Sequence, residues 1–439
     1  MTVAGAAALR PRPRPRRGPV ACSALVAFGL FGAAAAAEEP TVRPPPLQET
    51  PPLADALETG GAAPPPGAFP RVSFDVNMNL YGIGTPAASA RGREGFSSFL
   101  FGHASAGLHL APDFSVRAFV HPDPAGDFEP NGAVTFFRRQ NAILEQLFAE
   151  WRPAEGLQLY AGKFNAPFGY GHEYFPGVLA SFRAHDVYLI REQLGAGANW
   201  TPPAPEGWGA HRFSAAVFAL DTTFLSNSLV TRQRCCDPGF GRYVRTTLRQ
   251  GGAGNTGNLD NFAVSLEGTG IPAFPGLIYN LGLLSRGPGK DGARREWAWA
   301  AGLRHERAWT PAFRTFAFAE FVEFRNSGGN PLEEDEDGGE GIVSERRRFS
   351  TLGTQIQYAA WRATLVWQRD EAKRSRNALP TQDYYEASLG RDLAWGFGLD
   401  LGYQYARFAR DGGATGASHS VVGRLNLRFA THAGDGSGH

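Results

Sequence analysis

The sequence predicts an all-β protein, namely a transmembrane antiparallel β-barrel of about 16 strands with short periplasmic turns and long extracellular loops. Apolar and polar residues alternate with a period of two in many segments, and residues 395–405 are the most regular of them. Such alternation directs one row of side chains toward lipid and the other into a wet interior. The links between segments alternate between short and long, and tryptophans gather beside the short ones.

The composition fits this fold class. The chain has 439 residues, with Gly 55, Met 2, an aromatic content of 12% and a charged content of 19%. Glycine and aromatic residues suit many twisted strands, whereas these values do not suit a helical bundle or a coiled coil. Beyond the N-terminus, no uninterrupted apolar run reaches the roughly 18 residues that a membrane-spanning helix needs. A membrane role therefore requires strands.

Residues 1–37 are predicted to be a secretory signal peptide. Five arginines at 10–17 precede an apolar stretch at 20–32, and the alanines at 33–37 offer an A-x-A cleavage site. Removing five basic and no acidic residues from a chain with Lys+Arg 43 and Asp+Glu 42 leaves an acidic protein, so nucleic acid is not an expected partner. We expect export by the general secretory route to the bacterial outer membrane.

The following segment, residues 38–70, is rich in proline and alanine. Runs of proline favour an extended chain without a packed core. We expect a periplasmic tether here, and a plug or a partner-binding segment is the alternative.

Alternating segments fill residues 71–430, the predicted barrel, and residues 431–439 are a predicted C-terminal tail. Each segment has roughly the 9 to 11 residues that a tilted strand needs to cross a bilayer, and an even strand number is typical of bacterial barrels. The expected strands begin near Val72, Phe99, Phe114, Ile143, Leu157, Gln193, Arg212, Asn261, Leu277, Glu296, Phe313, Thr351, Arg362, Tyr384, Trp395 and Val421.

Seven short links and eight longer connections join these segments. The longest connections are expected at 82–95, 121–142, 165–192, 223–260 and 326–349. This asymmetry is typical of outer-membrane barrels and places both termini in the periplasm. Six of the nine tryptophans flank short links, as expected of an aromatic girdle at the periplasmic boundary. They are Trp151, Trp200, Trp208, Trp309, Trp361 and Trp395.

Two segments fit this pattern poorly. Residues 96–101 are ambiguous, and in 313–324 the charged Glu320 shares a row with Phe316, Phe318 and Val322. The second pattern predicts either a β-bulge that shifts the register or a misplaced strand.

A motif at the third long loop carries a resemblance to a known family. Residues 157–169 read LQLYAGKFNAPFG, and Pro176-Gly177 and the segment REQLG at 191–195 follow. This pattern resembles the strand-to-loop signature of Gram-negative outer-membrane porins and porin-like proteins, and the barrel pattern extends the resemblance over residues 71–430. The resemblance implies a homotrimer and assembly by the barrel assembly machinery. Phe429 stands for the terminal aromatic residue of such barrels, although ten residues follow it.

In porins the third loop folds inward and narrows the channel, so the resemblance assigns residues 165–192 to the constriction. Selectivity of a water-filled barrel comes from whatever narrows it. An alternative for His172 and His185 is that they cap turns in the extracellular mouth. The candidate constriction residues are Tyr170, His172, Glu173, Arg183, His185, Asp186 and Arg191, with Tyr174 and Tyr188 beside them.

Strand parity directs further charged residues into the interior, because a charge facing lipid costs about 2 to 4 kcal/mol at the midplane. Acidic and basic walls facing each other would create a transverse field that favours polar solutes, and salt bridges that only stiffen the wall are the alternative. The predicted wall residues are Asp75, Arg117, Glu150, Glu267, Glu296, Arg304, Arg362, Asp400, Arg424 and Arg428.

The remaining features do not indicate catalysis. The acidic run at 333–337 followed by arginines at 346–348 predicts either a site for divalent cations or lipopolysaccharide phosphates, or a solvated loop. Cys235 and Cys236 form a vicinal disulfide, pair between chains or have no role. Hydrolase and phosphate-loop motifs are absent, and His419-Ser420 is weak support for a membrane-embedded hydrolase. We expect no enzyme, cofactor or metal.

The expected function is passive diffusion of small hydrophilic solutes through a porin, with outer-membrane lipid and lipopolysaccharide as neighbours. The first alternative is a substrate-selective channel or receptor for an anion, a sugar or a metal chelate, with residues 165–192 as the binding constriction. The second is a non-pore barrel, either an enzyme or an adhesin.

Overall fold

The computed structural model describes residues 69–89, 93–124, 128–130, 132–137, 140–170, 175–230, 245–334, 340–375, 381–409 and 415–432. The expected signal peptide and nearly all of the proline-rich segment lie outside the described residues. So do Cys235, Cys236 and most of the acidic run.

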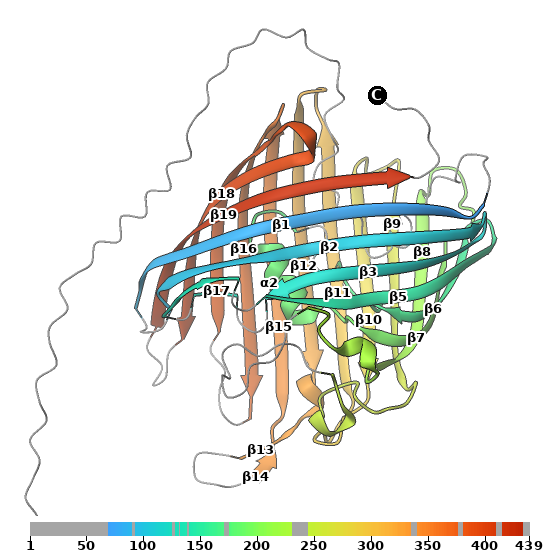
Figure 1. Cartoon of the computed structure of the whole chain (residues 1–439), viewed down its shortest axis with the longest axis horizontal. Helices are drawn as coiled ribbons and strands as arrows, with labels where there is room; N and C mark the ends of the chain where they lie inside the picture. Colours follow the sequence, from blue (N-terminus) through green and yellow to red (C-terminus); the bar gives the residue numbers. More distant parts are fainter. Residues whose placement is uncertain are drawn as a thin grey trace, which may run out of the picture. The chain divides into compact units, whose positions relative to one another are not determined.

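The described strands form a closed antiparallel barrel (Figure 1). Consecutive strands pair around the ring, and the last strand returns to pair with the first over the register Ser73↔His432 to Ala88↔Ser418. The sixteen strands of the wall are β1 (Arg71–Ala88), β2 (Gly95–Ala111), β3 (Phe114–Pro124), β5 (Gln140–Ala154), β6 (Leu157–Phe164), β7 (Gln193–Trp200), β8 (Ala210–Leu220), β9 (Asn261–Thr269), β10 (Leu277–Arg286), β11 (Glu296–Ala308), β12 (Phe313–Arg325), β15 (Glu345–Tyr358), β16 (Trp361–Arg374), β17 (Gln382–Asp392), β18 (Phe397–Ala409) and β19 (Thr415–His432).

Short elements occupy the long connections. Strand β4 (Val134–Phe136) adds three parallel pairs to the edge of β2, and β13 (Leu332–Glu334) pairs with β14 (Glu340–Ile342). The helix α2 (Ala180–Tyr188) lies within the ring of strands (Figure 1). Single-turn 3-10 helices are η1 (Phe224–Ser226), η3 (Leu248–Gln250), η4 (Ser327–Gly329) and η5 (Ala394–Gly396). None of the helices in the described ranges is long and apolar enough to span a membrane.

All sixteen predicted segments correspond to strands of the wall, so the predicted fold class is confirmed. Several boundaries differ from the predicted ones, and two of these differences have a local cause. The loop expected at 82–95 is much shorter, because β1 stays paired with β2 as far as Thr85 and continues to Ala88. Strand β18 begins at Phe397 because Trp395 adopts a left-handed conformation in the turn η5, with φ 58.

Period-two alternation produces the two faces of the wall. On β18, Leu401 is 59% exposed on the outside, whereas Asp400 is 3% exposed on the inside. The tryptophans that flank short links are all exposed on the outer surface, and Trp395 is the most exposed of them at 90%. This arrangement matches an aromatic girdle at one edge of a lipid-facing band.

The expected irregularity in β12 is absent, and the prediction of a bulge or a misplaced strand is wrong. The pairing of β12 with β11 and with β15 is regular along its whole length. Phe316, Phe318 and Val322 are buried on the inside together with Glu320. Their row is apolar because an inserted segment of the chain, rather than water, covers this part of the inner wall. The ambiguous stretch of β2 has the same cause, since Phe99 and Phe101 also face inward onto that segment.

Candidate constriction and outer cavity

The connection between β6 and β7, residues 165–192, is called the inserted loop here, and the structure describes 165–170 and 175–192 of it. Its residues are as buried as a protein core: Val178 and Leu179 have an exposed fraction of 0%. Since these residues lie between strands that point their inner faces at them, the loop crosses the interior of the barrel. The structure therefore has an inward loop at the position where the sequence predicted one.

Residues of the recognised motif close the base of the inserted loop. Ala166 donates its backbone N–H to Ile190 O at 2.8 Å, so the two ends of the loop run side by side. The side chain of Asn165 accepts the backbone N–H of Glu192 at 3.1 Å and donates to Glu145 at 2.6 Å. Lys163 holds Glu192 at 2.8 Å and Asp221 at 2.9 Å. The motif therefore holds the two ends of the inserted loop together and fixes where the loop enters and leaves the wall.

We expect Lys163→Met to destabilise the barrel by about 3 to 5 kcal/mol, because it removes one partner of a buried ion pair. The side chains of Lys163 and Asp221 are both 0% exposed. Burial raises the pKa of Glu192, and Lys163 opposes that rise. Without Lys163 this carboxyl favours its protonated form in the folded state, so the variant should be least destabilised at acidic pH and lose stability as the pH rises.

Urea unfolding followed by tryptophan fluorescence, at acidic and at neutral pH, measures this effect. If the urea midpoints of the variant equal those of the unmodified protein at both pH values, Lys163 does not stabilise the base of the loop.

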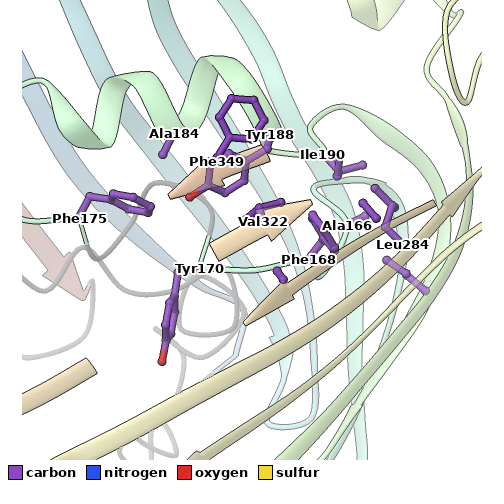
Figure 2. Close-up of a cluster of buried hydrophobic side chains, with 14 of the residues drawn as sticks. Ala166, Phe168, Tyr170, Phe175, Ala184, Tyr188, Ile190, Leu284, Val322 and Phe349 are labelled. Atoms are coloured by element: carbon purple, nitrogen blue, oxygen red, sulfur yellow. The ribbon is translucent and has the colours of Figure 1, made fainter. Parts of the chain in front are cut away.

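Aromatic side chains of the inserted loop pack against one side of the inner wall (Figure 2). Phe175 contacts Phe318 of β12 with ring centroids 4.5 Å apart, and Tyr188 contacts Phe349 of β15 at 5.5 Å. Glycines of the wall make room for the loop. A Cβ at Gly302 would lie 2.4 Å from the ring of Tyr170. Contacts of this kind bury apolar surface and hold the loop against β10, β11, β12 and β15.

A second cluster holds the helix α2 to the opposite wall. Phe182 contacts Phe101 of β2 with ring centroids 4.4 Å apart and Phe128 at 4.2 Å. Tyr81 of β1 meets the same ring edge-on at 6.2 Å. Because α2 touches both sides of the interior, the inserted loop spans the bore instead of lining one wall.

Two buried carboxylates of the wall bind the inserted loop. Glu320 of β12 accepts the backbone N–H of Tyr170 at 2.6 Å and the hydroxyl of Tyr188. Burial and the adjacent Glu320 raise the pKa of Tyr188, which keeps that hydroxyl protonated as a donor. Glu386 of β17 accepts the backbone N–H groups of Val178 and of Leu179, the latter at 2.9 Å. These N–H groups belong to the two residues just before α2, where the helix dipole also favours a negative charge.

The sequence did not identify these carboxylates as site residues. The sequence pattern marked Glu320 only as a charged residue in an apolar row, and it did not mark Glu386 at all. An acidic residue surrounded by inward apolar residues is the signal that would have found Glu320.

The predicted constriction residues that the structure describes do not form one group, because each contacts a different part of the barrel. Tyr170 is buried against the wall and donates its hydroxyl to Ile278 O at 3.2 Å. Arg183 on α2 pairs with Glu129 at 3.0 Å and lies 3.7 Å above the ring of Tyr384. Arg191 pairs with Asp123 at 2.9 Å near the base of the loop. His172, Glu173 and Tyr174 lie outside the described residues, as do the side chains of His185 and Asp186 in α2.

A cavity of about 210 Å³ lies between α2 and the long-loop ends of β15–β17. It combines arginines, acids, amides and aromatic rings. Arg347 pairs with Asp370 at 2.8 Å and lies 4.9 Å above the ring of Phe349. Its lining includes Arg93, Phe128, Glu129, Arg183, Val187, Tyr188, Arg347, Phe349, Gln368, Asp370 and Tyr384. Its four arginines, Arg369 included, outnumber its two acids, so the field in this outer cavity favours an anion.

Most of the predicted wall residues are fixed in ion pairs. Arg362 and Arg424 both contact Asp400 at 2.9 Å, and Arg117 contacts Glu150 at 3.1 Å. The remaining contacts are Asp75 with His103 at 3.1 Å, Arg212 with Glu267 at 2.5 Å, Arg286 with Glu296 at 2.5 Å and Arg304 with Glu306 at 3.4 Å. Arg428 lies near the short-turn end of β19. These pairs agree with a stiffened, polar inner wall.

No group of three or more histidine, cysteine, aspartate or glutamate side chains among the described residues is arranged to hold a metal ion.

Comparisons with known proteins agree with the geometry. No family model matches the chain, and no curated protein matches it. Among solved structures, Pseudomonas putida OprB at high pH is similar, with a TM-score of 0.54 and 10% identity over 82% of this chain and 94% of that chain. The outer membrane channel DcaP of Acinetobacter baumannii is similar with a TM-score of 0.50 and 8% identity over 82% of this chain and 97% of that chain. The chain therefore has the porin-like transmembrane β-barrel fold of bacterial outer-membrane proteins.

Proposed function

We propose that the protein is an outer-membrane channel for small hydrophilic solutes, with the inserted loop as its constriction. The observation that carries this proposal is a segment of chain packed across the interior of a barrel whose wall is lined by ionic residues. In a channel built this way, solutes cross by whatever route the loop and the wall leave between them, so their passage depends on size and charge. No energy source or catalytic step is part of the proposal.

Of the two transport alternatives, the geometry favours the substrate-selective channel over unselective passive diffusion. The outer cavity is the specific observation, because its arginines and aromatic rings form a pocket directly above the constriction. Guanidinium groups stacked on aromatic faces are well suited to an anionic solute with an apolar part. Passive diffusion of small hydrophilic solutes stays a prediction of the sequence.

The same proposal includes the surroundings of the barrel. We propose a homotrimer, assembly by the barrel assembly machinery, and outer-membrane lipid with lipopolysaccharide as neighbours. The similar fold of the outer membrane channel DcaP supports the location. The exposed tryptophans at one edge of the apolar surface support contact with lipid.

Ion selectivity in planar lipid bilayers tests the role of the outer cavity. The unmodified channel should prefer anions in a salt gradient, and the double variant Arg93→Gln, Arg183→Gln should shift the reversal potential toward cations, because it removes two of the four cavity arginines. The matched control is Arg307→Gln, which removes an exposed arginine stacked on Trp309 at the short-turn end. An identical reversal potential in all three proteins would contradict a charge-selective cavity. A folded barrel without conductance would contradict the channel itself.

A further inference from the structure

A group of arginines lies on the outer face of the barrel at the long-loop end of β12–β18. We call Arg325, Arg346, Arg348, Arg369 and Arg407 the outer cation cluster. Strand parity places them outside, because they alternate with buried inward residues such as Phe324, Phe349 and Phe408. Of these five residues, Arg369 alone also lines the outer cavity, which lies on the inside of the same strands.

Two buried carboxylates hold the outer cation cluster together. Glu323 is 2% exposed and contacts Arg325 at 3.0 Å, Arg346 at 2.5 Å and Arg348 at 2.9 Å. Asp383 contacts Arg407 at 3.0 Å and Arg369 at 3.7 Å. The two acids neutralise only part of the five positive charges, so the cluster keeps an excess of positive charge. The outward-directed parts of these guanidinium groups remain open to an external anion, since the side chains of Arg325 and Arg407 are more than half exposed.

An outward row of aromatic residues marks the depth of the cluster. Four outward aromatic residues each stand two positions away from a charged residue of this group. The pairs are Phe321 with Glu323, Trp367 with Arg369, Tyr385 with Asp383, and Tyr405 with Arg407. Tyr385 and Tyr405 have ring centroids 6.1 Å apart on neighbouring strands. Aromatic rings of this kind occupy the boundary between acyl chains and headgroups. The cluster therefore lies at the depth of the headgroups on the long-loop side.

An apolar groove continues from the cluster along the outer face of β15–β18. Its upper part has a volume of about 670 Å³ and is lined by Leu365, Trp367, Tyr403 and Tyr405 among others. A lower part of about 590 Å³ shares Leu365 and Tyr403 with it and extends to Leu389 and Leu401. The groove exists because small outward residues, Thr354 and Ala387, stand between these large ones. Its shape suits an acyl chain.

We propose that this face is a binding site for a phosphorylated lipid of the lipopolysaccharide class in the outer leaflet. Its phosphate would bind the outer cation cluster, and an acyl chain would lie in the groove beneath. Charge complementarity selects this occupant, because arginine presents a planar fork of donors that matches phosphate oxygens. The proposal rests on the outer-membrane location in the proposed function and names the partner and its site.

Binding of lipid A to the purified full-length protein in detergent, followed by native mass spectrometry, tests the site. The triple variant Arg346→Gln, Arg348→Gln, Arg407→Gln should bind bisphosphorylated lipid A about tenfold or more weakly. It keeps Arg325 beside Glu323 and Arg369 beside Asp383, so both acids retain a partner. Arg307→Gln, at the opposite edge of the outer face, is the control that should bind normally.

A second variant tests the groove without changing charge. Ala387→Trp fills the floor of the groove and should also weaken lipid A binding while the protein still shows the heat-modifiable migration of a folded barrel. Dephosphorylated lipid A should bind the unmodified protein weakly. Equal binding of the dephosphorylated lipid, displacement of lipid A by equimolar inorganic phosphate, or binding by the triple variant equal to that of the unmodified protein would each overturn the proposal.

Channel recordings separate this inference from the proposed function. In bilayers without lipid A, the triple variant should conduct like the unmodified protein, because its substitutions lie outside the bore. Normal conductance together with normal lipid A binding by the triple variant overturns only the lipid site. A change in oligomer mass that follows the substitutions in the absence of lipid would assign the face to a second copy of the chain and overturn the lipid site as well.

Discussion

The double variant Glu320→Ala, Glu386→Ala is expected to raise the single-channel conductance severalfold. In the unmodified protein each carboxylate accepts two hydrogen bonds from the inserted loop. Removing both leaves four buried donors of the loop without acceptors, at about 1 to 3 kcal/mol each. The total cost of these four unsatisfied donors exceeds the few kcal/mol of free energy that usually oppose the local opening of a protein segment. The loop should therefore leave the bore for much of the time.

Planar-bilayer recordings at fixed voltage measure this effect, with single variants expected to lie between the two extremes. Glu150→Ala is the matched control, because Glu150 is a buried inner-wall carboxylate whose contacts are Ser115, Arg117, Arg152 and Gln158 rather than the inserted loop. If the double variant and the control conduct equally, the two carboxylates do not hold the loop.

The second large effect is expected from Gly302→Val combined with Gly353→Val. A Cβ at Gly302 would lie 2.4 Å from the ring of Tyr170, and one at Gly353 would lie 2.4 Å from Cγ of Pro176. Real Cβ atoms do not approach other atoms so closely, so the loop must move away from β11 and β15. Overpacking of a well-packed site costs about 1 to 3 kcal/mol per position. We expect higher conductance and weaker discrimination between ions, without a change in the number of strands.

Gly423→Val is the control for the glycine pair. Gly423 also lies in a strand, but its Cβ would meet only Leu401 at 3.8 Å, an ordinary contact far from the loop. Its conductance should equal that of the unmodified protein. Circular dichroism and heat-modifiable migration verify that each variant is a folded barrel. A glycine pair variant that conducts normally would mean that the loop tolerates displacement without opening the bore.

Much of the fold was accessible from the sequence because a barrel strand is defined locally. Side chains on opposite faces of a strand meet lipid or water, and this difference recurs every second residue. Strands such as β16 and β18 could therefore be located without knowing their neighbours. The short links and their tryptophans then predicted an orientation for the barrel, since turn length and aromatic position are also local properties.

The same local pattern could not identify the contents of the bore. In β12 the inward row of Phe316, Phe318 and Val322 is apolar, as a lipid-facing row would be, so period two alone cannot assign its face. Its pairing with residues of the inserted loop joins positions more than a hundred residues apart, as the contacts of Glu320 with Tyr170 and Tyr188 illustrate. Periodicity carries no information about contacts at such separations.

The sequence by itself therefore determined the barrel, its strand number and the loop that enters it. Only the tertiary structure decided how that loop is held, which carboxylates bind it and where the outer cavity and outer cation cluster lie. The physical reason is that lipid and water act on each strand separately, whereas the loop is held by surfaces that exist only when distant strands have closed into one ring.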